Sequence, residues 1–191
     1  MPELPEVESV RRSLEPHALG RVIARAEVRR GDFCVFGPKP RAASPREFLQ
    51  SARIVRLERV GKQLAFVADD QRSCVLQLGM SGTVSINPAD TAKHTHAAWT
   101  LDDATRIDFV DPRRFGGITC YPTFDALSTH HWRDLGPDAL LAEPGHLIDA
   151  CNGAKRAIKA VLLDQSVLAG VGNIYADESL FRAGIDPRTI A

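Results

Sequence analysis

The sequence lacks several features that would assign it to a class at once. No apolar run reaches the roughly 18–20 residues of a membrane-spanning helix, and the acidic N-terminus is unlike a signal peptide, so we expect a cytoplasmic protein without membrane contact. The four cysteines form no C-x-x-C pair, which argues against a four-cysteine zinc ribbon and indicates reduced, structural thiols. Because 24 Lys and Arg balance 24 Asp and Glu, the chain is not a simple polycation.

The charge is nevertheless unevenly placed along the chain. Residues 1–62 hold 13 Lys and Arg against 8 Asp and Glu, whereas residues 63–191 hold 11 against 16. A basic half can face phosphate while the other half stays solvated, although this bias alone is weak evidence.

The N-terminus carries a reactive group. Removal of Met1 exposes Pro2 as a secondary amine, and an α-amino group titrates near ~7.7–8, so a share of it is neutral and nucleophilic at physiological pH. Glu3 is a candidate proton donor, and Glu6 is a second carboxylate one helical turn later. The same residues also suit an ordinary acidic helix start, because Pro5 and Glu6 are favoured in a first turn.

The pattern predicts an α+β fold. Apolar residues at Val7, Val10 and Leu14 predict an N-terminal helix that ends at Pro16. Short β-type runs separated by turn residues follow from Val22 to Phe109 and predict an antiparallel sandwich or barrel. Residues 31–47 are interpreted as an exposed loop with a short helical turn.

Helical sequence returns from about Phe124. Helices are predicted over 158–165 and 173–183, the latter closed by Gly184 as a C-cap. We therefore predict a catalytic domain over residues 1–130, a helix on a β-sandwich, and the start of a helical domain over residues 131–191.

Three motifs sit at strand ends. Lys62 follows Gly61 at the head of an apolar strand, where its ammonium can reach a phosphate. Met80 lies between glycines, which suits either a core filler or a wedge in a base stack. Arg113 and Phe115 share one tight turn, which suits insertion into a duplex and equally a surface hairpin.

Two further motifs are less specific alone. His94 and His96 lie in a predicted loop and lack a partner to complete a metal site, so we expect no metal and favour a phosphate contact or a plain polar loop. Gly170-x-Gly172 precedes a helix but lacks the third glycine of a dinucleotide fingerprint. Asn173 is predicted to be the helix cap and an anion ligand.

Together these motifs resemble the bacterial formamidopyrimidine-DNA glycosylases. The matching segments run in family order across essentially the whole chain, and jointly they are highly specific. They are residues 1–8, 61–62, 78–82, 93–94, 111–116 and 170–178.

The resemblance implies a base-excision-repair glycosylase and AP lyase that acts on damaged double-stranded DNA. Pro2 would form a Schiff base at the damaged nucleotide, Glu3 would protonate the sugar ring oxygen, and β- and δ-elimination would cut the strand. Oxidised purines such as 8-oxoguanine and formamidopyrimidines are the implied lesions. The protein would be a monomer of the bacterial cytoplasm, associated with the nucleoid.

The same resemblance implies the roles of the binding residues. Lys62, His94 and Asn173 would hold phosphates, and Lys159 would lie near the damaged base. Met80, Arg113 and Phe115 would fill the gap that the flipped nucleotide leaves.

The family also has a second helix after the Gly-Asn-Ile-Tyr motif and a C-terminal zinc finger. Neither is found in the 191 residues, so we expect a C-terminally truncated chain with no cofactor.

Three alternatives remain open. A tautomerase would also use an N-terminal proline, but as a base and at the head of a β-strand rather than a helix. A truncated, catalytically impaired DNA-binding remnant would keep the Pro2–Glu3 pair. A glycosylase of the related endonuclease VIII branch would prefer oxidised pyrimidines.

Overall fold

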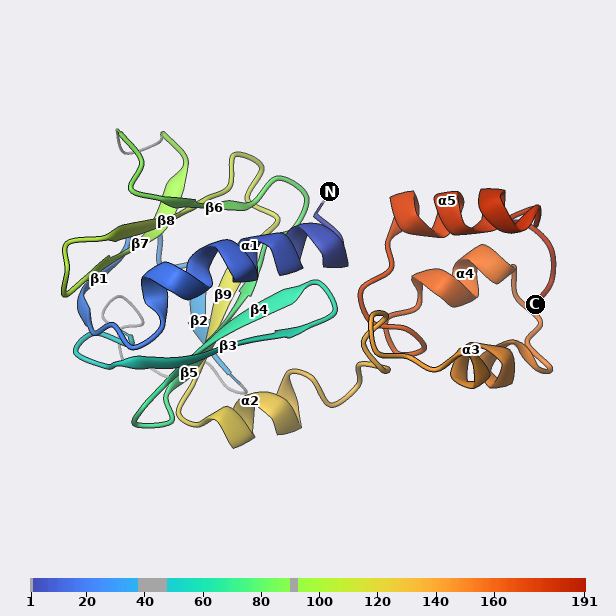
Figure 1. Cartoon of the computed structure of the whole chain (residues 1–191), viewed down its shortest axis with the longest axis horizontal. Helices are drawn as coiled ribbons and strands as arrows, with labels where there is room; N and C mark the ends of the chain where they lie inside the picture. The colour runs from blue at the N-terminus through green and yellow to red at the C-terminus, as the bar shows by residue number, and fades with distance from the viewer. Residues whose placement is uncertain (1, 38–47, 90–92) are drawn as a thin grey trace. The chain divides into compact units, whose positions relative to one another are not determined.

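A computed structural model describes residues 2–37, 48–89 and 93–191 (Figure 1). The chain forms two compact units. The first comprises Met1–Arg59 and Gln63–Arg133, and the second comprises Val60–Lys62 and Asp134–Ala191. Residues 38–47, in the predicted loop with a helical turn, lie outside the described residues.

Helix α1 (Leu4–Ala18) opens the first unit. Pro5 lies in its first turn, where the missing N–H costs nothing, and Leu4, Val7 and Leu14 form its buried stripe. The prediction that Pro16 ends the helix is wrong, because the helix continues to Ala18. So close to the end, Pro16 removes the hydrogen bond of its own nitrogen but leaves the preceding turns intact.

Two sheets follow α1 (Figure 1), with strand orders β1-β7-β8-β6 and β2-β9-β5-β4-β3. Phe66 of one sheet and Trp99 of the other meet in the shared core with ring centroids 5.3 Å apart. Burial of such a side chain contributes about 1.5–3 kcal/mol. The strands are β1 (Ile23–Val28), β2 (Cys34–Phe36), β3 (Ile54–Val60), β4 (Gln63–Ala68), β5 (Ser73–Gln77), β6 (Thr83–Ile86), β7 (Thr95–Leu101), β8 (Arg106–Val110) and β9 (Gly117–Tyr121).

The predicted fold class, a helix on antiparallel sheets followed by helices, is confirmed. One described strand pair departs from it, since β2 runs parallel to β9. Parallel pairing requires a long connection, and six strands separate these two along the chain. Cys34–Phe36 is therefore a strand, not part of a loop. Strand β9 was not predicted at all.

Three helices, α3 (Pro144–Cys151), α4 (Ile158–Leu163) and α5 (Asn173–Ala183), belong to the second unit, while α2 (Phe124–His130) closes the first. Gly184 ends α5 in the left-handed conformation with φ 68°, as predicted. Helix α4 ends before the predicted Gln165, because the Asp164 carboxylate accepts hydrogen bonds from the backbone and hydroxyl of Ser166 and forms a turn. No helix within the described ranges is long and apolar enough to cross a bilayer.

Candidate functional site

The start of α1 places two carboxylates beside Pro2. Pro2 is half-buried, and Glu3 is fully buried. The backbone N–H of Glu3 donates to Oε2 of Glu6 at 2.9 Å, as in a capping box. Glu6 thus fixes the backbone that carries Glu3, and its role as a second proton carrier stays a prediction.

Helix α1 is tied to strand β3 by a partly buried ion pair. Oε2 of Glu8 accepts a hydrogen bond from Nε of Arg59 at 3.0 Å, and Arg11 and Arg12 bind the same carboxylate. The hydrogen bond from Arg11 lowers the pKa of Glu8 to about 2; partial burial opposes this, and the bonds from Arg12 and Arg59 add to it. Pro2 and Glu3, which directly precede α1, are therefore attached to a helix that these ion pairs anchor to β3.

The turn that carries Met80 and the turn that carries Arg113 and Phe115 are joined. Oγ of Ser81 donates to Oδ1 of buried Asp111 at 2.6 Å. A Cβ on Gly79 would lie 2.5 Å from the backbone N of Gly116, so only glycine allows this approach.

Asp111 also holds its own turn. Its Oδ2 accepts the N–H of Gly116 at 2.7 Å, and its Oδ1 accepts the N–H of Arg113 at 3.3 Å. Burial alone would raise the pKa of Asp111, but hydrogen bonds from Ser81 and these backbone groups outweigh it and lower the pKa below the ordinary value. The sequence motifs contain Ser81 and Asp111, but nothing in their pattern predicted that a hydrogen bond between these two residues joins the turns.

These turns present two exposed apolar side chains and one cation. Met80 is 42% exposed and Phe115 is 59% exposed. The guanidinium of Arg113 lies over the Phe115 ring, 4.9 Å from its centroid. An apolar group and a stacked cation on a rigid turn can enter a base stack.

The histidine motif divides between a turn and a strand. Lys93 and His94 lie in a turn, whereas Thr95 and His96 belong to β7, which corrects the predicted loop. His96 is buried, and its Nε2 lies 2.8 Å from the carbonyl oxygen of Asp111. His96 is therefore a core residue behind the Asp111 turn. Among the described residues no group of three or more His, Cys, Asp and Glu could hold a metal ion.

In the second unit, the Gly61–Lys62 turn packs on the loop before α5. The N–H of Gly61 donates to Oδ2 of Asp138 at 2.9 Å. Gly61 has φ +56°, and a Cβ there would lie 3.0 Å from both Cβ of Ala169 and N of Gly170. Half-buried Lys62 thus belongs to the same unit as Asn173.

The glycine loop is held by a residue that sequence reasoning missed. Oε1 of Gln165 accepts the N–H of Gly170 at 3.0 Å, and Nε2 of Gln165 donates to the carbonyl of Val171 at 2.9 Å. One side chain therefore holds two consecutive backbone groups of the loop that leads into α5. A lone glutamine two residues after a helix gives no sequence signal of this role.

The prediction that Asn173 caps α5 is wrong. Gly172 is the N-cap, and Asn173 is the exposed first residue of the helix. Gly172 has the extended backbone of an N-cap, with φ −121° and ψ −164°, and Asn173 stays a candidate ligand at the helix start. Nζ of Lys159 lies 2.7 Å from Oδ1 of Asp177, so α4 and α5 share an ion pair at this residue.

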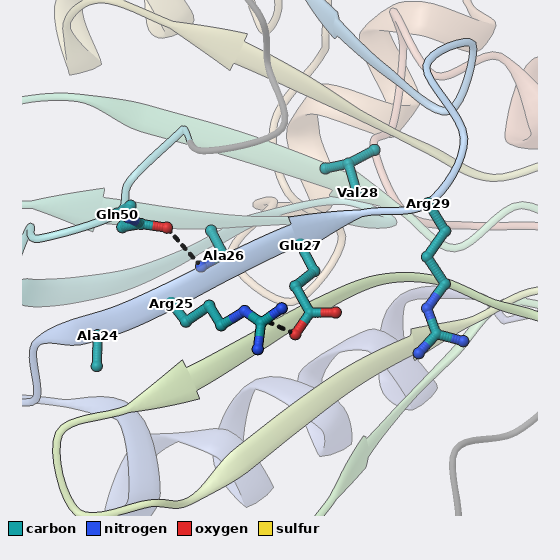
Figure 2. Close-up of a pocket in the computed structure, with 7 residues that line it drawn as sticks. All are labelled: Ala24, Arg25, Ala26, Glu27, Val28, Arg29 and Gln50. Carbon is teal, nitrogen blue, oxygen red and sulfur yellow. Dashed lines mark hydrogen bonds and ion pairs between the residues drawn. The ribbon is translucent and has the colours of Figure 1, made fainter.

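Strand β1 borders a depression of about 550 Å³, shown in Figure 2. Arg25 pairs with Glu27 at 3.1 Å, and Gln50 accepts the N–H of Ala26 at 3.2 Å. None of the predicted site residues lines it, so we assign it no part in the reaction.

Comparison with known proteins identifies the architecture. Residues 1–118 match the model of the formamidopyrimidine-DNA glycosylase N-terminal domain, and residues 135–191 match that of the formamidopyrimidine-DNA glycosylase H2TH domain. This chain belongs to the formamidopyrimidine-DNA glycosylase family. The family comprises base-excision-repair enzymes with DNA glycosylase and AP lyase activity.

Two curated relatives carry the name formamidopyrimidine-DNA glycosylase. The protein of Paracoccus denitrificans is 44% identical over 207 residues, which cover 100% of this chain and 70% of that protein. The protein of Acidiphilium cryptum is 43% identical over 193 residues, which cover 100% of this chain and 68% of the relative.

Two solved structures give the same result. The MutM (Fpg) protein of Thermus thermophilus has a TM-score of 0.81 at 36% identity, covering 99% of this chain and 67% of that one. The Fpg of Lactococcus lactis in complex with DNA containing an abasic site has a TM-score of 0.84 at 28% identity, covering 98% and 69%.

Proposed function

We propose that this glycosylase removes oxidised purines, 8-oxoguanine and formamidopyrimidines, from double-stranded DNA and then cleaves the strand through a Schiff base at Pro2. The observation that carries the proposal is the fully buried carboxylate of Glu3 directly after Pro2, at the start of a helix anchored by Glu8 and Arg59. The chain acts on DNA as a monomer, and each step uses its own groups.

The first step forms a bond between the Pro2 nitrogen and the anomeric carbon of the damaged nucleotide, and the base leaves. Pro2 is a secondary amine once Met1 is removed, so its neutral form has the lone pair that this attack requires. Glu3 supplies a proton to the sugar ring oxygen, and the ring opens to an iminium. Burial of Glu3 keeps water from competing for that proton.

The iminium then drives strand cleavage. It withdraws electrons from the neighbouring carbon, so the 2′ protons become acidic and β-elimination expels the 3′ phosphate. A second elimination expels the 5′ phosphate. Lys62, His94, Asn173 and Lys159 are the proposed contacts to DNA around the lesion.

The flipped nucleotide leaves a gap that exposed side chains fill. Unstacking and unpairing a base cost a few kcal/mol. Met80 and Phe115 project from the two turns that Ser81 and Asp111 join, and Arg113 is proposed to face the orphaned base. Because the hydrogen bond between Ser81 and Asp111 already joins the two turns in the free protein, inserting these side chains into DNA needs little reorganisation of the backbone.

The test is excision by the protein with an untagged N-terminus on an 8-oxoguanine:cytosine duplex, compared with a duplex that already contains an abasic site. Glu3→Gln should block base removal more than cleavage at the abasic site. Equal loss of both activities would rule out Glu3 as the ring-oxygen acid.

A panel of lesions defines the substrate class. A structure of Lactococcus lactis Fpg contains DNA with an oxidised pyrimidine, so the panel includes oxidised pyrimidines beside the purines. Preference for the pyrimidines would overturn the purine assignment and leave the family unchanged.

A further inference from the structure

Met80 is the sole methionine of the chain once Met1 is removed. It lies in the turn after β5, and its side chain is 42% exposed. The thioether sulfur is soft and polarizable, and unlike a thiol it needs no deprotonation before it reacts with an oxidant. Access to the side chain therefore decides its reactivity, and the folded protein leaves Met80 open to solvent.

The backbone on both sides of Met80 holds this side chain at the surface. Gly79 has φ +62°, and a Cβ there would lie 2.5 Å from the backbone N of Gly116, so the residue before Met80 packs directly on the neighbouring turn. On the other side, Oγ of Ser81 donates to Oδ1 of Asp111 at 2.6 Å. The turn is thus fixed at both flanks, and Met80 stays at its tip.

The cysteine thiols, the other oxidisable sulfur groups, are better protected. Cys34, Cys74 and Cys120 lie in the core and are at most 2% exposed. Burial raises the pKa of Cys74, and the contact with Cys34 raises the pKa of Cys120, with burial adding to it. Because the thiolate is the form that attacks a peroxide, these three thiols react slowly. Cys151 is half-buried and is the thiol that a test has to control.

We propose that Met80 is an oxidation site, at which hydrogen peroxide converts the thioether into methionine sulfoxide and so weakens insertion of this turn into damaged DNA. The inference rests on the proposed function, because it takes the gap in the base stack as the place that Met80 enters. The sulfur lone pair attacks one oxygen of the peroxide, the O–O bond breaks, and the sulfoxide forms as water leaves. The sulfur loses two electrons, and the peroxide gains them.

The added oxygen changes what the side chain does between bases. The thioether is apolar, whereas the sulfoxide is polar and accepts hydrogen bonds from water in the free protein. Insertion between stacked bases removes that water, so the oxidised side chain loses hydrogen bonds that the thioether never had. Methionine sulfoxide reductases return the sulfur to the thioether, which makes the loss reversible. The same oxidants that damage DNA bases would thus reduce lesion capture until a reductase acts.

The test treats the folded protein with hydrogen peroxide and follows the peptides by mass spectrometry. The peptide that contains Met80 should gain about 16 Da, the mass of one oxygen atom. Affinity for a duplex with a stable abasic-site analogue, measured by fluorescence anisotropy, should fall about tenfold for the oxidised protein. Sulfoxide reductases with dithiothreitol should restore both mass and affinity. Cleavage of a single-stranded oligonucleotide with an abasic site should stay unchanged, because that substrate has no base stack to fill.

Two variants make the test specific, each compared with its own untreated sample. Met80→Leu keeps an apolar side chain of similar size without the sulfur, so peroxide should no longer change its affinity. Cys151→Ser removes the half-buried thiol and should respond to peroxide as the wild type does. No oxidation of Met80 in the folded protein, unchanged affinity after its oxidation, or an equal loss in treated Met80→Leu would each overturn the inference.

The affinity measurement separates this inference from the proposed function, because the abasic analogue is bound without excision. If the untreated wild type excises no lesion but oxidation of Met80 still weakens binding reversibly, the oxidation site stands and the proposed reaction fails. If the untreated wild type excises 8-oxoguanine and the oxidised protein binds and excises equally well, the reaction stands and the oxidation site fails. Failure of the untreated protein to bind the duplex would overturn both.

Discussion

The Ser81 hydroxyl donates to the Asp111 carboxylate at 2.6 Å and so joins the turn of Met80 to the turn of Arg113 and Phe115. Ser81→Ala should destabilise the protein by roughly 1.5–3 kcal/mol, because a hydrogen bond to a buried charged group is lost. Lesion excision from duplex DNA should fall as the two turns separate. Denaturant unfolding and excision rates measure the two effects. Wild-type excision despite lower stability would show that the hydrogen bond between Ser81 and Asp111 serves folding only.

Met80 and Phe115, the exposed apolar side chains proposed to fill the gap in the base stack, should contribute to excision and little to stability. Because Phe115 is 59% exposed, Phe115→Ala should change the free energy of unfolding by less than about 0.5 kcal/mol while slowing excision from duplex DNA. Phe181 is 83% exposed on α5, and Phe181→Ala is the matched control that should leave excision intact. A similar loss in both variants would refute a specific role for Phe115.

The turn before Lys62 depends on glycine for two reasons. Gly61→Ala places a side chain at φ +56° and within 3.0 Å of Ala169. Gly153→Ala is the control, since Gly153 has φ +77° with nothing within 4 Å of a Cβ. The control should lose about 1–2 kcal/mol of stability, and Gly61→Ala should lose more, together with DNA affinity. Equal losses in stability and unchanged affinity would show that the close packing is unimportant.

Glu8 should give the protein an acid-sensitive step. Its pKa falls from the ordinary 4.5 to about 2 in the folded state, so its contribution is complete above pH 4.5 and is lost as the pH falls toward 2. Glu8→Gln should therefore lower Tm at pH 6 and flatten the dependence of Tm on pH below 4.5. Glu58→Gln, which removes an exposed pair with Arg56, should leave that dependence unchanged. An unchanged profile in Glu8→Gln would contradict the role of the pair.

The sequence predicted the elements whose signals are local. Gly184 marks the end of α5 because glycine adopts φ > 0 at low cost, and the stripe of Val7 and Leu14 marks α1. Strand β7 was only partly predicted, because Thr95–Trp99 is buried throughout and shows no alternation. His96 was accordingly assigned to a loop, although it packs behind Asp111.

The remaining features depend on contacts between distant residues. The bond from Ser81 to Asp111 spans 30 positions, and that from Gly61 to Asp138 spans 77. Neither partner has a spacing that predicts the other. The candidate catalytic residues were therefore accessible from motifs, whereas the residues that position them required the fold.

The most direct test of the account is to trap the reaction intermediate. The protein with a free Pro2 is incubated with an 8-oxoguanine:cytosine duplex and borohydride, and the adduct is located by peptide mass spectrometry. The account predicts a covalent DNA adduct on the Pro2 nitrogen, absent in Pro2→Gly and in protein with an N-terminal extension. An adduct on a lysine, or an undiminished adduct in the extended protein, would contradict it.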